Sequence, residues 1–299
     1  MEIIDIHAHI FQKVAGITKG APMTSLKDGK VKIGNNISQF MPPSFENTNS
    51  RVETLIAYMD WCGISKALLM PNPYYGYHND YFLEAIERYP DRLRGVALVD
   101  LLKGEQAARE LETLYEKTPL FGFKVETDST FQCAPDKHLA DPEFNPVWDL
   151  CSQCRQPVFL HLFTDRDVED LEILVREFPG STYVICHMGA DSCFAPGRNP
   201  RNYERLLKLV KERENVYMDT STVPVYFSEE YPFPSSTSAI KKAAKTVGPE
   251  KLMWASDYPG MLNHATMKEL ICMVTKHCAF SDDDLEMIMG GTARRLFFQ

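Results

Sequence analysis

Eight short apolar segments rich in β-branched residues recur along the chain, and segments with helical periodicity separate them. In DVEDLEILVREF, for example, apolar residues recur every three or four positions, which is the period of an amphipathic helix. Strands that alternate with helices predict a parallel sheet, and eight strands are enough to close a barrel. The sequence therefore predicts the α/β class, with residues 1–299 forming a single (β/α)8 TIM barrel. The eight segments are 3–10, 66–71, 94–100, 120–126, 156–163, 182–189, 215–221 and 251–259.

One interval between the expected strands is longer than a βα unit requires. Residues 11–50 follow the first strand and are rich in Gly, Ser, Asn and Pro. Because they leave the carboxyl end of a strand, we expect this insertion to lie over the mouth of the barrel. It is expected to form a short hairpin in part and to act as a lid.

Composition excludes several classes of partner. The 299 residues carry a formal net charge of -9, and no stretch concentrates Lys and Arg, so neither nucleic acid nor an anionic membrane is an expected partner. No apolar run has the length of a membrane span, and no export signal is recognisable. The eight cysteines are therefore expected to be reduced thiols of a cytoplasmic protein.

The first expected strand carries three polar residues at alternate positions of an apolar run. These are Asp5, His7 and His9 in MEIIDIHAHIF, and alternate side chains of a strand project from the same face. Two adjacent imidazoles are typical of a metal site, but hydrogen-bonded core histidines are an alternative. Asp5 either orients one imidazole or binds a neighbouring strand end.

Polar residues also terminate three later strands. His161 ends PVFLH, His187 ends YVICH and Asp257 ends WASD. In a (β/α)8 barrel the carboxyl ends of the strands converge on the active site, so these residues are expected to meet His7 and His9 there. Three imidazoles and a carboxylate suit zinc, although manganese, iron or cobalt can occupy such a site.

These motifs resemble the amidohydrolase superfamily. HAH, the His that ends the fifth strand, HMG, SDYP and the closing GGTARRLF are most similar to the amidohydrolase-related branch that includes aminocarboxymuconate-semialdehyde decarboxylase. The chain departs from that branch at Thr292, where the closing motif usually has Asn. The resemblance implies that His7, His9, His161 and Asp257 ligate one divalent metal. It also implies that His187 shuttles protons or binds a second ion.

Lys124 near the end of the fourth strand decides whether a second metal fits. Other members of the superfamily carry a carboxylated lysine there, which bridges two metals. An unmodified Lys124 would instead bind a substrate carboxylate or pair with an acidic neighbour.

The resemblance predicts an enzyme that hydrolyses an amide or lactone ester through a metal-activated water. Asp257 would act as the general base, and His187 would stabilise the oxyanion or relay the proton. The alternative is non-oxidative decarboxylation of an aromatic or unsaturated acid, which needs a cation near the substrate carboxylate. Arg166 and Arg198 are the candidates, although each also fits a solvated surface arginine. A barrel that binds a ligand without catalysis is a third possibility, disfavoured because the whole residue set is present.

Aromatic residues in two loops suggest which kind of substrate the site accepts. Tyr75 lies in PNPYYGYHND after the second strand, and a second aromatic stretch follows the seventh. A covered, apolar mouth suits a small cyclic or aromatic acid. The same loops would also fit a homodimer interface.

Overall fold

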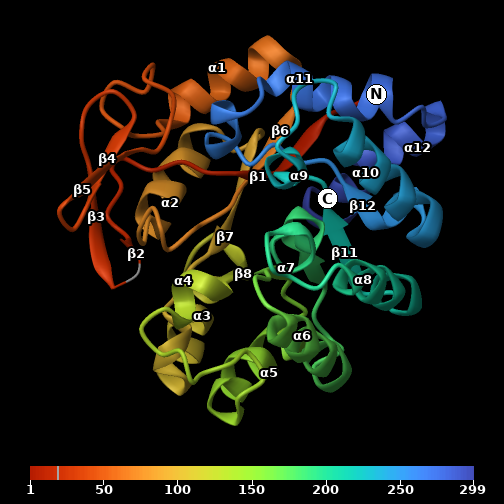
Figure 1. The fold of residues 1–299 in the computed structure, drawn as a ribbon. Helices are drawn as coiled ribbons and strands as arrows, with labels where there is room; N and C mark the ends of the chain where they lie inside the picture. Colours follow the sequence, from red (N-terminus) through yellow and green to blue (C-terminus); the bar gives the residue numbers. More distant parts are fainter. Residues whose placement is uncertain (19) are drawn as a thin grey trace.

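The computed structural model describes residues 1–18 and 20–299 and confirms the predicted (β/α)8 TIM barrel. Eight parallel strands follow one another in chain order, and helices surround them (Figure 1). The strands are β1 (Ile4–Ala8), β6 (Lys66–Leu69), β7 (Leu93–Ala97), β8 (Phe121–Glu126), β9 (Val158–His161), β10 (Tyr183–Ile185), β11 (Val216–Asp219) and β12 (Leu252–Met253).

The barrel closes where the segment after β12 meets β1. The Asp257 N–H donates to the His7 carbonyl (2.8 Å), and the His9 N–H donates to the Tyr258 carbonyl (2.7 Å). Predicted site residues from both ends of the chain thus lie on the seam between the first and the last strand.

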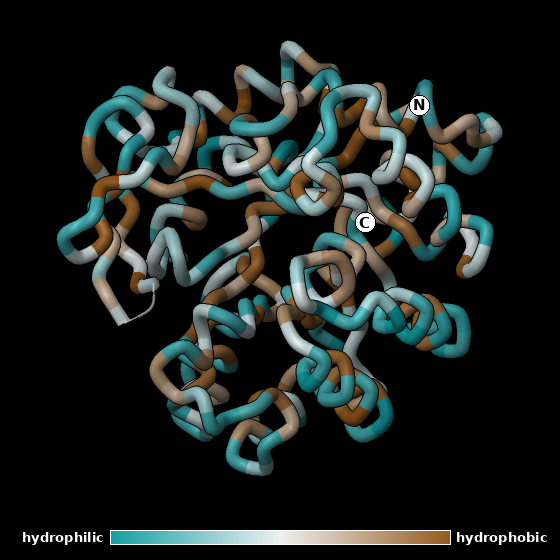
Figure 2. Tube along the Cα trace, in the orientation of Figure 1, coloured by the Kyte–Doolittle hydropathy of each residue, from teal (hydrophilic) through white to brown (hydrophobic). Residues whose placement is uncertain are grey.

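The helices bury their apolar sides against the outside of the strands, and polar residues cover their outer faces (Figure 2). None of the helices in the described residues is both long and apolar enough to cross a bilayer. The α-helices are α1 (Val52–Cys62), α2 (Asn79–Arg88), α3 (Glu105–Lys117), α4 (Thr127–Phe131), α5 (Asn145–Gln153), α6 (Asp165–Glu177), α7 (Ala190–Phe194), α8 (Arg201–Glu212), α9 (Val223–Phe227), α10 (Pro234–Val247), α11 (Met267–Cys272), α12 (Asp282–Glu286) and α13 (Thr292–Phe297).

Short helical turns complete the connections. The 3₁₀ turns are Leu101–Lys103, Pro142–Phe144, Cys186–Gly189, Pro249–Lys251 and Gly260–Asn263, and π turns span Met273–His277 and Met287–Gly291.

The C-terminal helix α13 covers the amino ends of the strands. Phe297 packs against Phe121 and Phe159, with ring centroids 6.0 and 5.5 Å apart, and both of these residues lie early in their strands. Thr292, the position that departs from the closing motif, is buried and donates to the Glu250 carbonyl (3.1 Å). The opposite end of the barrel, where the strands have their carboxyl ends, is therefore where the candidate site lies.

The insertion at 11–50 forms a four-stranded antiparallel sheet, drawn in red and orange at the left of Figure 1. It contacts loops at the carboxyl ends of the strands: Asn263 Nδ2 donates to the Phe40 carbonyl (2.9 Å), and Gln132 Nε2 donates to the Ile17 carbonyl (2.9 Å). The insertion is more extensive than the expected hairpin, and its action as a lid stays a prediction. Its strands are β2 (Ile17–Thr18), β3 (Ala21–Ser25), β4 (Lys30–Ile33) and β5 (Asn36–Gln39).

Candidate metal centre

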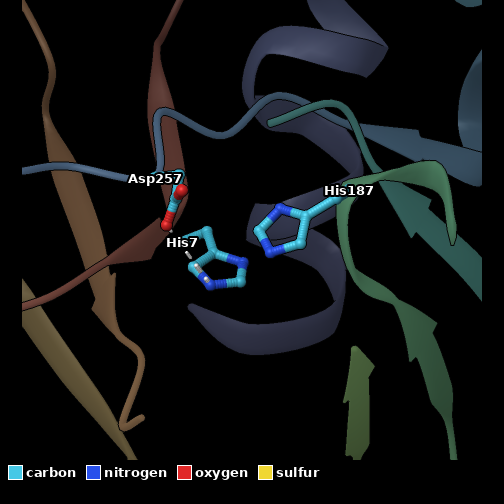
Figure 3. A group of neighbouring side chains, drawn as sticks. All are labelled: His7, His187 and Asp257. Atoms are coloured by element: carbon cyan, nitrogen blue, oxygen red, sulfur yellow. Dashed lines mark ion pairs between the residues drawn. The ribbon is translucent and has the colours of Figure 1, made fainter. Parts of the chain in front are cut away.

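His7, His187 and Asp257 meet at the mouth of the barrel, as the sequence predicts. One potential ligand atom from each lies within 4.8 Å of the others, and the three side chains point toward one another (Figure 3). His7 Nε2 lies 3.9 Å from Asp257 Oδ1, and the rings of His7 and His187 are 4.6 Å apart. The two histidines are almost completely buried, at 1% and 3% exposure.

His9 joins this cluster from the same strand as His7. Its Nδ1 lies 2.6 Å from the Met70 carbonyl and its Nε2 lies 3.0 Å from Asp257 Oδ1. Because a carbonyl only accepts, Nδ1 carries a proton, and Nε2 of the neutral ring turns a lone pair toward a carboxylate. Such a pair requires a shared proton or a cation between the two residues.

Asp257 presents its carboxylate in a fixed orientation. Thr222 Oγ1 donates to Oδ2 (2.8 Å), while Oδ1 faces the two histidines of the N-terminal segment. Burial raises the pKa of Asp257, but the contact with His9 and the neighbouring His187 outweigh burial and hold the pKa below the ordinary value of 3.8. The carboxyl group is therefore ionised.

Asp219, which ends β11, lies beneath the histidines. Oδ2 faces His7 Nδ1 (3.0 Å), and Oδ1 accepts from the His187 N–H (2.8 Å) and from Ser221. Burial raises the pKa of Asp219, but its interactions with His7 outweigh burial and lower the pKa below 3.8. Asp219 was not predicted from the sequence, although it ends an apolar strand just as His161 and Asp257 do.

His187 lies in the turn that follows β10 rather than on the strand itself. His187 and Met188 both have φ of 56°, and Gly189 follows with φ of 69°. Left-handed backbone is costly for residues with a side chain and is typical of functional sites. Burial, together with His161 and His7, lowers the pKa of His187 well below 6.5, which keeps the ring neutral.

His161 ends β9, but both of its ring nitrogens contact carboxylates. Nδ1 faces Glu126 Oε1 and Nε2 faces Asp191 Oδ2, which also accepts from Tyr226. Burial lowers the pKa of His161, but Glu126 and Asp191 outweigh it and raise the pKa to about 9. Its ring centroid is 4.3 Å from that of His187. Metal ligation by His161 stays a prediction, and it requires one ring nitrogen to leave its contact with Glu126 or Asp191.

Lys124 and Glu126 face the barrel interior together from β8. Lys124 Nζ lies 3.3 Å from Glu126 Oε2 and 3.5 Å from Cys186 Sγ. This is the arrangement of an unmodified lysine paired with an acidic neighbour, one of the three roles considered for Lys124. Glu126 was missed from the sequence, although it too ends an apolar segment.

Asp5 does not orient an imidazole. Its carboxylate accepts from the backbone N–H groups of His7 (3.1 Å) and Ser256 (2.9 Å) and from the Ser256 hydroxyl. Burial raises the pKa of Asp5 to about 7. Of its two expected roles, the bond to a neighbouring strand end is the one observed.

Of the three expected substrate contacts outside β8, only Tyr75 lies at the cluster. Its ring is 4.9 Å from that of His9 and stacks on Phe11 at 4.3 Å. Arg166 is exposed at the start of α6 and its Nε lies 2.9 Å from Asp170 one helical turn away, so a contact with the substrate stays a prediction. Arg198 is exposed in the loop between α7 and α8, and its contact with the substrate likewise stays a prediction.

Comparisons with known proteins identify the family of the chain. Residues 4–299 match the family described as amidohydrolase. No curated protein sequence matches the chain significantly.

Several solved structures share the fold. One is a "probable 2-pyrone-4,6-dicarboxylic acid hydrolase" of Acinetobacter baumannii with bound citric acid, with 20% identity, a TM-score of 0.72 and all of both chains covered. Another is an amidohydrolase of Burkholderia multivorans with bound zinc, with 17% identity, a TM-score of 0.73 and 99% of this chain and 98% of that chain covered. A third is 5-carboxyvanillate decarboxylase of Sphingomonas paucimobilis, with 18% identity, a TM-score of 0.67 and 99% of each chain covered.

The family match spans nearly the whole chain, and the resemblance to the amidohydrolase-related branch is confirmed. Both hydrolases and decarboxylases occur among proteins of this shape. The chain is an enzyme of the amidohydrolase family.

Proposed function

We propose that this enzyme is a metal-dependent hydrolase that cleaves an amide or lactone ester of a small cyclic or aromatic acid. The observation that carries the proposal is the cluster of His7, His9, His187 and Asp257 at the barrel mouth. It offers imidazole and carboxylate ligands to one divalent cation.

The unpaired atoms of the cluster fit a metal. His7 Nε2 is buried and has no hydrogen-bond partner among the described residues, although it points toward Asp257. His9 Nε2 and Asp257 Oδ1 face each other at 3.0 Å, and a neutral His9 ring offers only a lone pair there, because its one N–H is used at Nδ1 by the Met70 carbonyl. A cation between these atoms satisfies all three, and desolvated acceptors are costly without one.

We propose His7, His9 and Asp257 as ligands of one metal, with a further imidazole from His187 or His161. Zinc suits this mixture of nitrogen and oxygen donors, and manganese, iron or cobalt are alternatives. A metal bound here lowers the pKa of water and polarises a carbonyl. A second, lysine-bridged metal has less support, because Lys124 Nζ already contacts Glu126 and Cys186.

The protein's own groups provide the proton transfers. Asp257 is ionised, so it accepts the proton of the attacking water and later delivers it to the leaving group. Thr222 holds the carboxylate in place through Oδ2. His187, across the cluster, relays a proton or stabilises the oxyanion, while Tyr75 borders the substrate next to His9.

The positions of the positively charged side chains support decarboxylation less than hydrolysis. That reaction needs a positive side chain near the substrate carboxylate, but Arg166 reaches Asp170 and Arg198 is exposed on the surface. The buried cations Lys124 and His161 already face protein carboxylates. An amide or ester carbonyl is neutral and has no such requirement. The ring compounds named for the structural neighbours support a small cyclic substrate.

All eight cysteines are free in the structure, and we propose a reducing, cytoplasmic location on that basis. A homodimer through the aromatic loops stays a prediction.

Metal analysis of the purified protein tests this proposal first. We expect about one equivalent of zinc or a similar ion per chain, lost in a His7→Ala/His9→Ala variant. A His264→Ala variant is the control, because that histidine is exposed and outside the cluster. A native protein that binds no metal even after reconstitution contradicts the proposal.

Parallel assays then separate the two reactions. Amine release from an amide library and proton release from a lactone library measure hydrolysis, and carbon dioxide release from aromatic acids measures decarboxylation. Carbon dioxide release without hydrolysis would replace the proposed reaction with its alternative.

A further inference from the structure

The buried carboxylate of Asp219 joins two histidines of the cluster. Oδ1 accepts from the backbone N–H groups of His187 (2.8 Å) and Ser221 (3.1 Å) and from the Ser221 hydroxyl, and Oδ2 lies 3.0 Å from His7 Nδ1. The residue is 0% exposed. A carboxylate with this many donors is an acceptor only, so the hydrogen atom of each contact belongs to the partner.

The direction of these bonds fixes the protonation of both rings. The Ser221 hydroxyl has a single hydrogen and gives it to Asp219, so its oxygen can only accept from His187 Nδ1, which lies 2.7 Å away. His187 Nδ1 therefore carries the proton of the neutral ring. The same reasoning places the proton of His7 on Nδ1, which donates to Asp219.

We infer that Asp219 and Ser221 are positioning residues that hold His7 and His187 in the Nδ1–H form, so that both rings turn a bare Nε2 toward Asp257. This inference rests on the proposed function, whose cluster it completes. The Nδ1–H form also favours proton relay over oxyanion stabilisation as the role of His187. A bare Nε2 accepts a proton or binds a metal, whereas oxyanion stabilisation by the neutral ring needs an N–H at that position.

The backbone supports the same assignment. His187 and Met188 adopt left-handed conformations, which are costly for residues with side chains. The bond from the His187 N–H to Asp219 holds this turn in place, and the ring is then directed into the cluster (Figure 3). Asp219 thus sets both the orientation of the ring and, through Ser221, its tautomer.

Nitrogen-15 NMR of histidine-labelled, metal-free full-length protein tests the inference directly. The His187 signals are assigned by their loss in a His187→Gln variant. We expect Nδ1 with an attached proton and Nε2 with a free lone pair. The opposite tautomer in the wild-type protein, or an averaged signal from both, would overturn the inference without any reference to activity.

Variants at Ser221 provide the second test. Ser221→Ala removes the acceptor for Nδ1–H and should shift the His187 signals toward a mixture of tautomers, whereas Ser221→Thr should restore the wild-type pattern. Ser236→Ala is the matched control, because Ser236 is also buried and also donates to a carboxylate, Glu229, but lies outside the cluster. A spectrum of the Ser221→Ala variant identical to that of the wild type would contradict the role of Ser221.

Asp219→Asn extends the test to metal binding. An amide in place of the carboxylate can donate to His7 Nδ1 and impose the wrong tautomer while the geometry stays intact. We expect zinc affinity to fall about 10–100-fold, as for other residues that orient metal-binding histidines. Unchanged affinity would contradict the inference, whereas a wild-type protein with the expected tautomers but no metal would contradict only the proposed function.

Discussion

Lys124 Nζ and Glu126 Oε2 lie 3.3 Å apart on the inward face of β8, with their side chains 0% and 1% exposed. The other carboxylate oxygen of Glu126 contacts His161, so this ion pair connects the barrel interior to its mouth. Burial raises the pKa of Glu126, but His161 and Lys124 outweigh it and hold the carboxyl ionised.

Breaking this ion pair from one side should be strongly destabilising. Lys124→Met leaves Glu126 buried with one partner fewer, and we expect the free energy of unfolding to fall by about 3–5 kcal/mol. Lys124→Met/Glu126→Gln should lose less than the single variant, because no unpaired charge remains. Urea unfolding monitored by fluorescence measures both. Lys137→Met is the control, since its pair with Glu143 is exposed and should contribute little to stability.

Asp257→Asn should separate proton transfer from metal binding. The amide keeps an oxygen that can bind a metal but cannot accept the water proton, so we expect turnover to fall at least about 10²–10⁴-fold while most of the metal is retained. Steady-state kinetics and metal analysis of the same preparation check this. Asp283→Asn, an exposed position on α12, should change neither. Full activity in the Asp257 variant would exclude this residue as the general base.

The turn that carries His187 should not tolerate a side chain at Gly189. A Cβ there would lie 2.3 Å from Leu206 Cδ1, and φ is 69°. We expect Gly189→Ala to lower the free energy of unfolding by about 1 kcal/mol for the backbone and by roughly a further 1–3 kcal/mol for overpacking. At Gly197, φ is 79° but no atom lies within 4 Å of the added Cβ, so Gly197→Ala should show the backbone cost alone. Equal losses in thermal unfolding would mean that the space around Gly189 is not limiting.

Glu229 should make stability depend on pH. Its carboxylate accepts from the Ser235 and Ser236 N–H groups at the start of α10, both at 2.8 Å. Burial raises the pKa of Glu229, but the bond from the Ser236 hydroxyl (2.7 Å) and these two N–H bonds outweigh burial and lower the pKa below 4.5. A lowered folded-state pKa means that the stabilisation is complete above the unfolded-state pKa and is lost as pH falls through the folded-state value.

Glu229→Gln should therefore cost about 1 kcal/mol at neutral pH, the usual value of a helix N-terminal cap, and progressively less below about pH 4.5. Urea unfolding between about pH 3 and 7 measures the difference. Glu230→Gln makes the same chemical change at an exposed neighbouring position and should cost little at any pH. A cost at Glu229 that does not change with pH would show that the charge has no part in the cap.

The barrel could be predicted from sequence because its strands are buried on both faces. Segments such as 156–163 and 182–189 are nearly continuous apolar runs, and each contains a strand of the barrel. The sheet of the insertion was harder to predict. All four residues of β5 are exposed, so no apolar alternation marks them as a strand.

The residues of the cluster could be predicted because polar residues end apolar strands, and the same signal would have found Asp219 and Glu126. The partners of His161 could not be found in this way. Asp191 lies on α7 and Tyr226 on α9, and only the folded chain brings them to the ring. Which nitrogen of each histidine is free depends on such tertiary contacts and not on spacing.

The seam of the barrel has a consequence for the timing of synthesis. His7 is made long before Asp257, which follows 250 residues later (257 − 7). Until that last segment has emerged and closed against β1, the imidazoles of the N-terminal segment lack their carboxylate partner. The proposed metal site therefore stays incomplete through most of translation, and we expect tight binding of a divalent cation only after the segment that follows β12 has closed against β1.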